Sequence, residues 1–153
     1  MKNKIFNSKG FTLIEILIVI SIIAILASTV GTNFIGFDSE ARIAATQSNL
    51  ESIRMRIEIF RAKEGRFPDT LTELTNTFYL DMGVKRAYLK KMPGELVSNS
   101  AGNMAVVILT STDDLTNEGG WVYVKDLAEV KVNLSDPLSK KWGKFSGELP
   151  SEW

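Results

Sequence analysis

Residues 9–37 read KGFTLIEILIVISIIAILASTVGTNFIGF, and this stretch decides the fold. From Phe11 to Phe37 the only ionisable side chain is that of Glu15. As a helix, these residues would extend about 40 Å at roughly 1.5 Å per residue, which is enough to cross the hydrocarbon core of a bilayer. The sequence therefore predicts a long, apolar helix over residues 11–37.

The preceding residues, 1–10, carry three lysines and no acid. Positive charge before an apolar span holds that end of the chain in the cytoplasm. We therefore expect residues 1–10 to be a cytoplasmic leader and everything from Asp38 onward to lie outside the cytoplasm. Two other interpretations stay open, namely a secretory signal peptide cut near Ala24 and Ala27, and an uncleaved signal anchor. Neither of them accounts for an acid inside the span.

Glu15 is costly in an apolar helix, by about 2.5 to 3.5 kcal/mol at the centre of a membrane span and less near its end. Residues 11–37 contain no basic side chain that could pair with it. A cut between Gly10 and Phe11 would create an α-amino group near Glu15, with an unperturbed pKa of about 7.7 to 8.0. A second copy of the chain, displaced along the helix, could then present its amino group to this carboxylate. The sequence thus predicts cleavage and self-assembly together, with Phe11 and Glu15 as the assembly residues.

The run KGFTLIE at residues 9–15, followed by the apolar segment, resembles the prepilin cleavage and methylation motif of type IV pilins and type II secretion pseudopilins. The resemblance implies that a prepilin peptidase cuts between Gly10 and Phe11 and that the amino group of Phe11 is methylated. It also implies a homo-oligomeric helical filament. The implied partners are the prepilin peptidase, a membrane assembly platform with its ATPase, and minor pseudopilins.

For the whole protein, the resemblance implies a structural subunit with no catalytic role. Such a subunit would sit in the bacterial inner membrane with one span, its amino terminus inside and its head extracytoplasmic, until it joins a filament in the periplasm or at the cell surface. The expected filament is a type II secretion pseudopilus or a type IV pilus-like filament that supports protein secretion. A minor or priming pilin, a DNA-uptake pilin and, from another class, a signal-anchored extracytoplasmic enzyme using carboxylates stay open.

The composition restricts the available chemistry. The chain contains no cysteine and no histidine, so disulfides, cysteine and histidine catalysis, and most zinc sites are excluded. Many type IV pilins close a carboxyl-terminal loop with a disulfide, and its absence here favours a pseudopilin-like protein. The 18 basic and 18 acidic side chains balance, so no net charge attracts nucleic acid. We expect no cofactor.

Gly31 and Thr32 mark a departure from the family, because many members have a proline where this chain has Thr32. That proline helps the helix to melt locally during assembly. Both residues here are weak helix formers, glycine by about 1 kcal/mol relative to alanine, so they are candidates for a softer hinge. Close helix packing at a small residue is the alternative.

The helix is expected to continue through the amphipathic residues 38–64. Its apolar side chains recur at helical spacing, at Ile43, Leu50, Ile53, Ile57 and Phe60. We place the end of the helix at about Lys63, with Gly65 as a left-handed C-cap and Pro68 as a stop. Two ion pairs at i,i+4 spacing are expected on the exposed turns, Asp38 with Arg42 and Arg54 with Glu58.

Residues 65–153 are expected to form the head. A short helix should start at Asp69 as its N-cap, and residues 75–103 are expected to be a loop with local order at 87–92. Strands are predicted over residues 104–110, 121–125 and 129–133, the last two as a hairpin, with Trp121 and Tyr123 in the core. The tail from Asp136 covers either the sheet or a neighbour. The fold class is therefore α+β, pilin-like, with a long helix packed on a small antiparallel sheet.

Two groups of polar side chains are candidate binding sites. Type II major pseudopilins often hold calcium in an acidic carboxyl-terminal loop, but the position and spacing of the oxygen donors differ here, and we expect solvated turn residues. These donors are Asp113, Asp114, Asn117 and Glu118. A basic group without a stacking motif is expected to be solvated surface, with no nucleic acid bound. It consists of Lys85, Arg86, Lys90 and Lys91.

Overall fold

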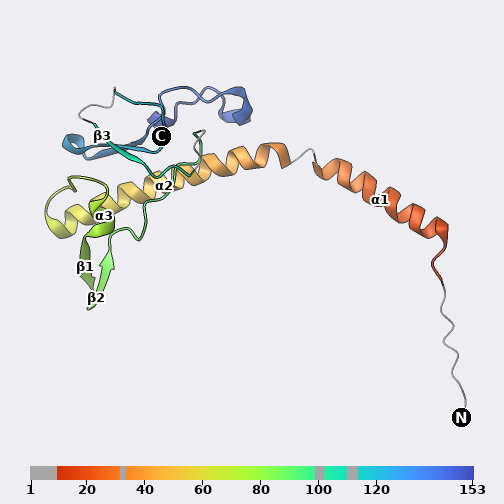
Figure 1. Cartoon of the computed structure of the whole chain (residues 1–153), viewed down its shortest axis with the longest axis horizontal. Coiled ribbons are helices and arrows are strands. Elements are labelled where there is room, and N and C mark those ends of the chain that lie inside the picture. Colours follow the sequence, from red (N-terminus) through yellow and green to blue (C-terminus); the bar gives the residue numbers. More distant parts are fainter. Residues whose placement is uncertain (1–9, 32–33, 99–101, 110–113) are drawn as a thin grey trace, which may run out of the picture. The chain divides into compact units, whose positions relative to one another are not determined.

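The structure is a computed structural model that describes residues 10–31, 34–98, 102–109 and 114–153 (Figure 1). Contacts divide the chain into two units, Met1–Phe37 and Asp38–Trp153. The first unit carries helix α1 (Leu13–Gly31), and helix α2 (Phe34–Glu64) continues into the second. The long amino-terminal helical region with small β-sheets after it confirms the predicted α+β, pilin-like class.

Helix α1 is apolar on every face. Its large side chains between Ile14 and Leu26 are 48% to 65% exposed within the described structure. The hydroxyl groups of Ser21 and Ser28 donate to the main-chain carbonyls of Leu17 and Ile25, so the helix satisfies these polar groups internally. Within the described ranges, no helix is both long enough and apolar enough to span a membrane.

Helix α2 contributes to both apolar clusters of the second unit. The predicted apolar stripe is confirmed, because every one of its members is buried: Ile43, Leu50, Ile53, Ile57 and Phe60. The helix ends at Glu64, one residue beyond the predicted end. Gly65 follows with φ +72° and donates its main-chain N–H to the carbonyl of Arg61 at 2.9 Å, which confirms the left-handed C-cap.

One of the two predicted ion pairs on α2 is confirmed and the other is wrong. Asp38 and Arg42 pair at 3.1 Å. Arg54 pairs with Glu51 at 2.6 Å instead of with Glu58. Its guanidinium turns toward the head, where it also donates to two main-chain carbonyl groups, and this orientation points it away from the next turn of the helix.

A β-hairpin that the sequence did not predict follows the helix. Strand β1 (Phe78–Asp81) pairs antiparallel with β2 (Val84–Ala87) through a tight turn at Met82 and Gly83. Both turn residues have positive φ, +48° and +81°, as a type I′ turn requires. The loop predicted over residues 75–103 is therefore wrong for this part. In Figure 1 the hairpin projects away from α2.

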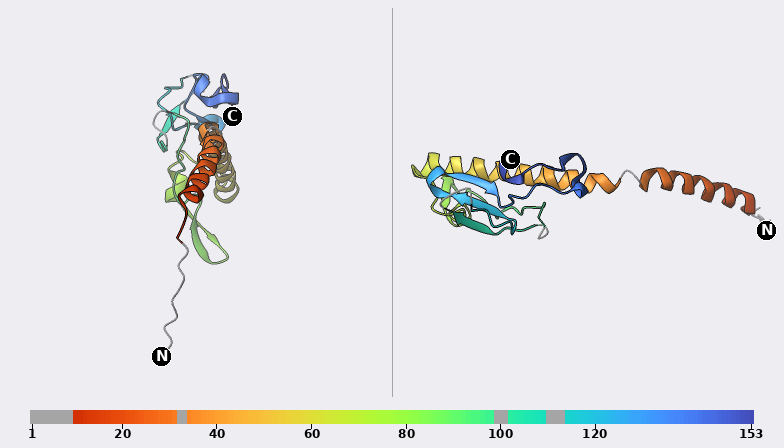
Figure 2. Two further views of the ribbon diagram at one scale, coloured as in Figure 1. Left: turned by 90° about the vertical axis from the view of Figure 1, so that its right-hand side faces the viewer. Right: turned by 90° about the horizontal axis from the view of Figure 1, so that it is seen from above.

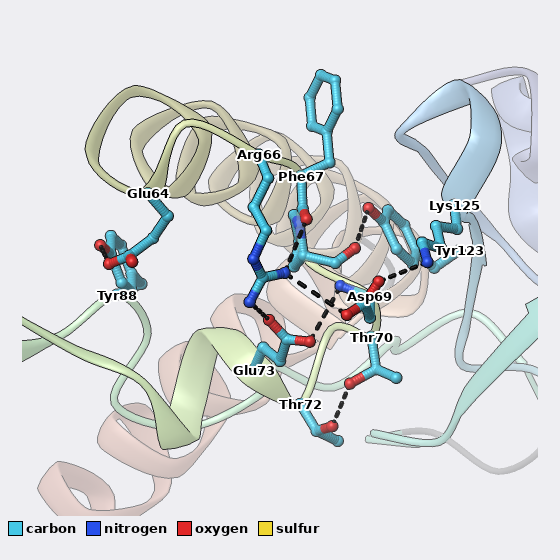
Figure 3. A network of polar contacts seen from close by, with 11 residues as sticks. Glu64, Arg66, Phe67, Asp69, Thr70, Thr72, Glu73, Tyr88, Tyr123 and Lys125 are labelled. Atoms are coloured by element: carbon cyan, nitrogen blue, oxygen red, sulfur yellow. Dashed lines mark hydrogen bonds and ion pairs between the residues drawn. The ribbon is translucent and has the colours of Figure 1, made fainter.

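The short helix before the hairpin, α3 (Glu73–Asn76), starts later than predicted. Thr72 stands at its N-cap position without a side-chain hydrogen bond, so the predicted cap by Asp69 is wrong. Asp69 instead pairs with Lys125 at 2.5 Å, while Arg66 pairs with Glu73 at 2.9 Å (Figure 3). These ion pairs connect the end of the long helix to α3 and to the sheet.

The main sheet has the strand order β3-β4-β5. Strands β4 (Trp121–Val124) and β5 (Glu129–Val132) form the predicted hairpin. Strand β3 (Val106–Leu109) runs parallel to β4, so the sheet is mixed and the expectation of a wholly antiparallel sheet is wrong for this pair. Residues 110–120 connect the two strands, a length close to the dozen or so residues that the crossover of a parallel pair usually needs.

The core lies between this sheet and α2 (Figure 2). Trp121 and Tyr123 are fully buried there, which confirms their predicted place. The indole N–H of Trp121 donates to the carbonyl of Pro93 at 2.8 Å, and the hydroxyl of Tyr123 donates to the carbonyl of Pro68 at 2.8 Å. Strand β4 thus connects to two separate loops through its buried aromatic side chains.

The carboxyl-terminal tail covers its own chain. Leu138 and Trp142 pack with Ile43 of α2 and with Val97 in a second apolar cluster. Two short 3-10 helices, Lys140–Phe145 and Pro150–Glu152, shape this segment. The tail therefore contacts the amino-terminal part of α2 in the same unit and, through Pro150–Glu152, strand β5 of the sheet. Contact of the tail with a neighbouring subunit stays a prediction.

Glu95 is a fully buried carboxylate that joins two segments of the head. Its Oε1 accepts the main-chain N–H groups of Val97 and of Ser98, the latter at 2.7 Å, and its Oε2 accepts that of Gly120 at 3.4 Å. Gly119 and Gly120 both have positive φ, a backbone conformation that is strained for residues with a side chain. The turn after Pro93 is thereby fixed against the start of β4.

Replacing Tyr123 by Phe should lower the free energy of unfolding at neutral pH by about 1 kcal/mol, because the buried Pro68 carbonyl loses its donor. Burial raises the pKa of Tyr123 to about 12, compared with about 10 for an unfolded tyrosine. The fold therefore favours the neutral phenol, and stability is lost as the pH rises from about 10 through 12.

Urea titrations of the two proteins between pH 8 and about pH 12 check this prediction. The Tyr123→Phe variant should lose less stability over the alkaline range than the unmodified chain. Burial also raises the pKa of Tyr88 to about 12. Tyr88 is present in both proteins, so the variant should still lose some stability at alkaline pH. Equal losses in both proteins would contradict the prediction.

Candidate functional site

Glu15 and Thr12 form a reciprocal pair at the start of α1. The main-chain N–H and the hydroxyl of Thr12 both donate to Oε2 of Glu15, at 2.8 and 2.7 Å. The main-chain N–H of Glu15 donates back to the Thr12 hydroxyl at 3.3 Å. Since α1 begins at Leu13, Thr12 occupies the N-cap and Glu15 the third helical position, which together make a capping box.

This pair adds a residue that the sequence analysis missed. Glu15 was expected to have no partner in its own chain, whereas Thr12 supplies two neutral hydrogen-bond donors. The T-x-x-E spacing of a capping box was the signal that could have revealed it. The donors orient the carboxylate without neutralising it, and the other oxygen, Oε1, has no partner in the described part of the chain. A cation from elsewhere is still needed if this region becomes apolar.

Gly10 and Phe11 precede the helix and are exposed. The phenyl ring of Phe11 projects from non-helical backbone, and a β-carbon added at Gly10 would meet no other atom within 4 Å. Exposed backbone outside regular structure is where proteases act most readily. The predicted cleavage bond is thus accessible.

The candidate hinge lies at the limit of the described residues. Gly31 is the last residue of α1, and Thr32 falls outside the described ranges. Asp113, one of the four candidate calcium ligands, also falls outside them. Both predictions therefore stay predictions for these residues.

For the remaining calcium candidates, the structure shows a competing use of the central oxygen. Oδ1 of Asn117 accepts hydrogen bonds from the main-chain N–H and hydroxyl of Ser135, at 2.6 and 3.0 Å, and from the N–H of Asp136 at 3.3 Å. An oxygen that accepts three hydrogen bonds has no lone pair directed at a cation. Among the described residues, no group of three acidic side chains could hold a metal. Oδ1 of Asn117 is therefore engaged within its own chain and is not free to bind calcium.

The Asn117→Gly variant should therefore lose about 1 to 2 kcal/mol of stability, because the donors of Ser135 and Asp136 lose their acceptor. Glycine accepts the positive φ of this position, +60°, so the loss reports the side chain rather than backbone strain. Thermal unfolding should give the same midpoint for the unmodified chain in EDTA and in calcium chloride. A midpoint raised by calcium and not by magnesium would reinstate the metal site.

The predicted basic group lies in one place. Lys85, Arg86, Lys90 and Lys91 line a groove of about 710 Å³ beside the β1–β2 hairpin. Arg56 of α2 and the rings of Phe78 and Tyr79 line the same groove. The sequence indicated a solvated basic group but not that it lines a concave surface, because the unpredicted hairpin forms one of the walls of the groove.

Residues 5–31 match the family model described as the prokaryotic N-terminal methylation motif, a range that includes the Gly10 bond, the Thr12 cap and Glu15. The chain is a distant homologue of type IV pilins and type II secretion pseudopilins. Proteins of the pilin family are typically structural and non-enzymatic.

Two kinds of relative illustrate the homology. The type IV major pilin protein PilA of Myxococcus xanthus is 34% identical over 68 residues, which cover 44% of this chain and 31% of PilA. The type II secretion system core protein G of Pectobacterium carotovorum is 32% identical over 65 residues, 42% of each chain, and that of Klebsiella pneumoniae is 34% identical over 64 residues, 42% of this chain and 46% of the other. The chain thus matches less than half the length of these relatives. No solved structure matches it.

Proposed function

We propose that this chain is a structural subunit of a type II secretion pseudopilus or a related type IV pilus-like filament that supports protein secretion. In this proposal the chain is cut between Gly10 and Phe11, methylated on the new amino group of Phe11, and then polymerised. The observation that carries the proposal is the methylation motif at the start of a helix that is apolar on every face. A helix of this kind requires an apolar environment all round.

The apolar surface of α1 supports two successive environments for residues 11–37. Burying one Ile or Leu side chain fully contributes about 1.5 to 3 kcal/mol, and α1 exposes a continuous series of them. In the prepilin, lipid of the inner membrane covers these side chains. In the filament, the helices of neighbouring subunits cover them instead, so the subunit exchanges one apolar environment for another at little cost.

The cut provides the cation that Glu15 lacks. The amino group of Phe11 in one subunit pairs with the Glu15 carboxylate of its neighbour, and methylation leaves this amine able to carry its charge. The capping box supports this step because Thr12 holds Oε2 and leaves Oε1 without a partner among the described residues. Apolar packing alone would let like helices slide, whereas an ion pair in an apolar environment fixes their register.

Mass spectrometry of the protein extracted from membranes tests the proposal. The expected mature chain lacks residues 1–10 and begins with N-methylated Phe11. A strain without prepilin peptidase serves as the control and should retain the full-length chain. A mature protein that begins near Ser28, or an uncut protein in the presence of the peptidase, would contradict the proposal. Electron microscopy of sheared filaments that contain the mature chain would then establish polymerisation.

A further inference from the structure

A basic groove lies on one side of α2. We use this name for the surface of about 710 Å³ whose lining includes Arg56, Phe78, Lys85, Lys90 and Lys91. In the described part of the chain, Arg56, Lys90 and Lys91 make no ion pair, although nine other ion pairs are described there. The groove therefore has positive charge that its own chain leaves uncompensated.

An acidic groove of about 590 Å³ lies between α2 and the β4–β5 connection. Its carboxylates are those of Glu51, Glu58 and Glu129, and Met55 and Leu127 provide apolar surface, 62% and 65% exposed. Each carboxylate has a basic neighbour in its own chain, at 2.6 to 3.9 Å. The three carboxylates are exposed, whereas Arg54, which also lines this groove, and Lys131 are partly buried. Pairs of this kind near the surface contribute at most about 1 kcal/mol, so the carboxylates can exchange them for partners on another molecule.

The two grooves open on opposite flanks of α2. A helix turns about 100° per residue, so Glu51 and Glu58, seven residues apart, share one flank. Arg56 is rotated by roughly 140° to 160° from both of them and lies on the other flank. Both grooves belong to the same unit, Asp38–Trp153, so their placement relative to each other is fixed by this helix.

Apolar surface accompanies the charge on both sides. The β1–β2 hairpin beside the basic groove exposes Phe78, Leu80, Met82 and Val84, with Leu80 73% exposed. A two-stranded hairpin that presents such side chains to water is marginally stable by itself. Met55 and Leu127 of the acidic groove offer an apolar surface of the kind that could cover them.

We infer that the basic groove of one copy receives the acidic groove of a second copy, so that subunit heads contact one another side by side around the filament. The inference rests on the proposed function and specifies which head surfaces meet. Because the two surfaces differ and lie on opposite flanks of α2, the contact is heterologous and can be repeated without closing on itself. Opposite charge would set the register of the heads, and the apolar side chains would supply contact area.

Cross-linking tests this contact in assembled filaments. The chain contains no cysteine, so the double variant Met55→Cys with Lys90→Cys has one thiol in each groove. A short bis-maleimide should produce a ladder of dimers, trimers and longer oligomers. Either single variant should give monomers only. A double variant that gives no cross-links, or dimers alone, would overturn the inference, because dimers indicate a contact that closes.

Charge reversal provides a second and independent test. Lys90→Glu with Lys91→Glu, and separately Glu51→Lys with Glu58→Lys, should each lower the yield of filaments about tenfold. The four substitutions together should restore most of the yield, because opposite charges meet again. The control Lys140→Glu with Lys141→Glu makes the same charge change elsewhere and should assemble normally. Unchanged yields from both reversals, or no recovery in the combined variant, would overturn the inference.

These results separate the inference from the proposed function. If the unmodified chain is cut and forms filaments but gives no ladder and no charge effect, only the groove contact is wrong. If the unmodified chain is not cut before Phe11 and forms no filament, the proposed function fails and the inference fails with it. Thermal unfolding midpoints close to that of the unmodified chain show that the exposed substitutions leave the head folded.

Discussion

Filaments should be absent, or reduced by about tenfold or more, when Glu15 is replaced by Gln. The reason is charge, because glutamine also forms a capping box with an N-cap threonine and so preserves the start of α1. What the variant loses is the negative partner for the amino group of a neighbouring Phe11. Cleavage after Gly10 should continue, because the cut bond precedes the helix. Filament yield from sheared cells, with mass spectrometry of the subunit, measures both effects.

Thr12→Ala provides the matched control for this prediction. It removes the hydroxyl of the capping box, which costs about 1 kcal/mol, and leaves the carboxylate charge in place. We expect a smaller loss of filaments than with Glu15→Gln. Glu15→Ala removes the charge and the side-chain half of the capping box, leaves the N-cap hydroxyl of Thr12 in place, and should resemble Glu15→Gln. Normal filaments from the Gln variant would show that Glu15 acts as a helix cap and would remove the ion pair from the proposal.

Trp121→Ala should prevent the head from folding stably. Trp121 is fully buried between the sheet and α2, and deletion of such a side chain typically costs about 3 to 5 kcal/mol. The Pro93 carbonyl also loses its donor, which adds about 1 to 3 kcal/mol if the carbonyl stays dry. Domains of this size are stable by about 5 to 15 kcal/mol in total, so the variant should be largely unfolded or degraded.

Urea unfolding of the detergent-solubilised chain, followed by the fluorescence of Trp142 and Trp153, measures this loss. Trp121→Phe keeps a buried ring but loses the indole donor. Its free energy of unfolding should therefore lie between those of Trp121→Ala and the unmodified chain. Leu80→Ala, at an exposed position, should change the free energy of unfolding by less than about 0.5 kcal/mol. A cooperative transition of nearly full stability in Trp121→Ala would contradict the assigned core.

The features that were predictable from the sequence depend on local pattern. The stripe from Ile43 to Phe60 repeats at helical spacing, so both the end of α2 and its buried face could be predicted. Gly65 follows the helix as a left-handed C-cap, a position where glycine is common because it accepts positive φ. The β4–β5 hairpin was also predictable, because its two strands are close in sequence and rich in β-branched and aromatic residues.

The features that were missed depend on contacts between distant residues. Arg54 does not pair with Glu58, because its guanidinium donates to main-chain carbonyl groups of the head. Asp69 pairs with Lys125, far away in the sequence, rather than capping α3. The turn of the β1–β2 hairpin uses Met82 before Gly83, and methionine is an uncommon residue for a left-handed position.

The candidate site shows the same division. The motif around Gly10, Phe11 and Glu15 is contiguous, so it could be recognised in one pass along the chain. Thr12 also lies inside this motif, but its role becomes visible only when the helix start is known. The basic and acidic grooves could not be predicted, because each combines side chains of α2 with side chains at least 19 residues away along the chain.

The parallel pairing of β3 with β4 has a consequence for the order in which the head folds. A short connection joins strands β4 and β5, so they can pair on the microsecond timescale on which hairpins form. Strand β3 can add only after a longer loop has closed, and it then gains neighbours on one edge alone. Native-state hydrogen exchange should therefore show the β3 amides opening before those of β4, so that a late-forming edge is the weakest protected part of the sheet.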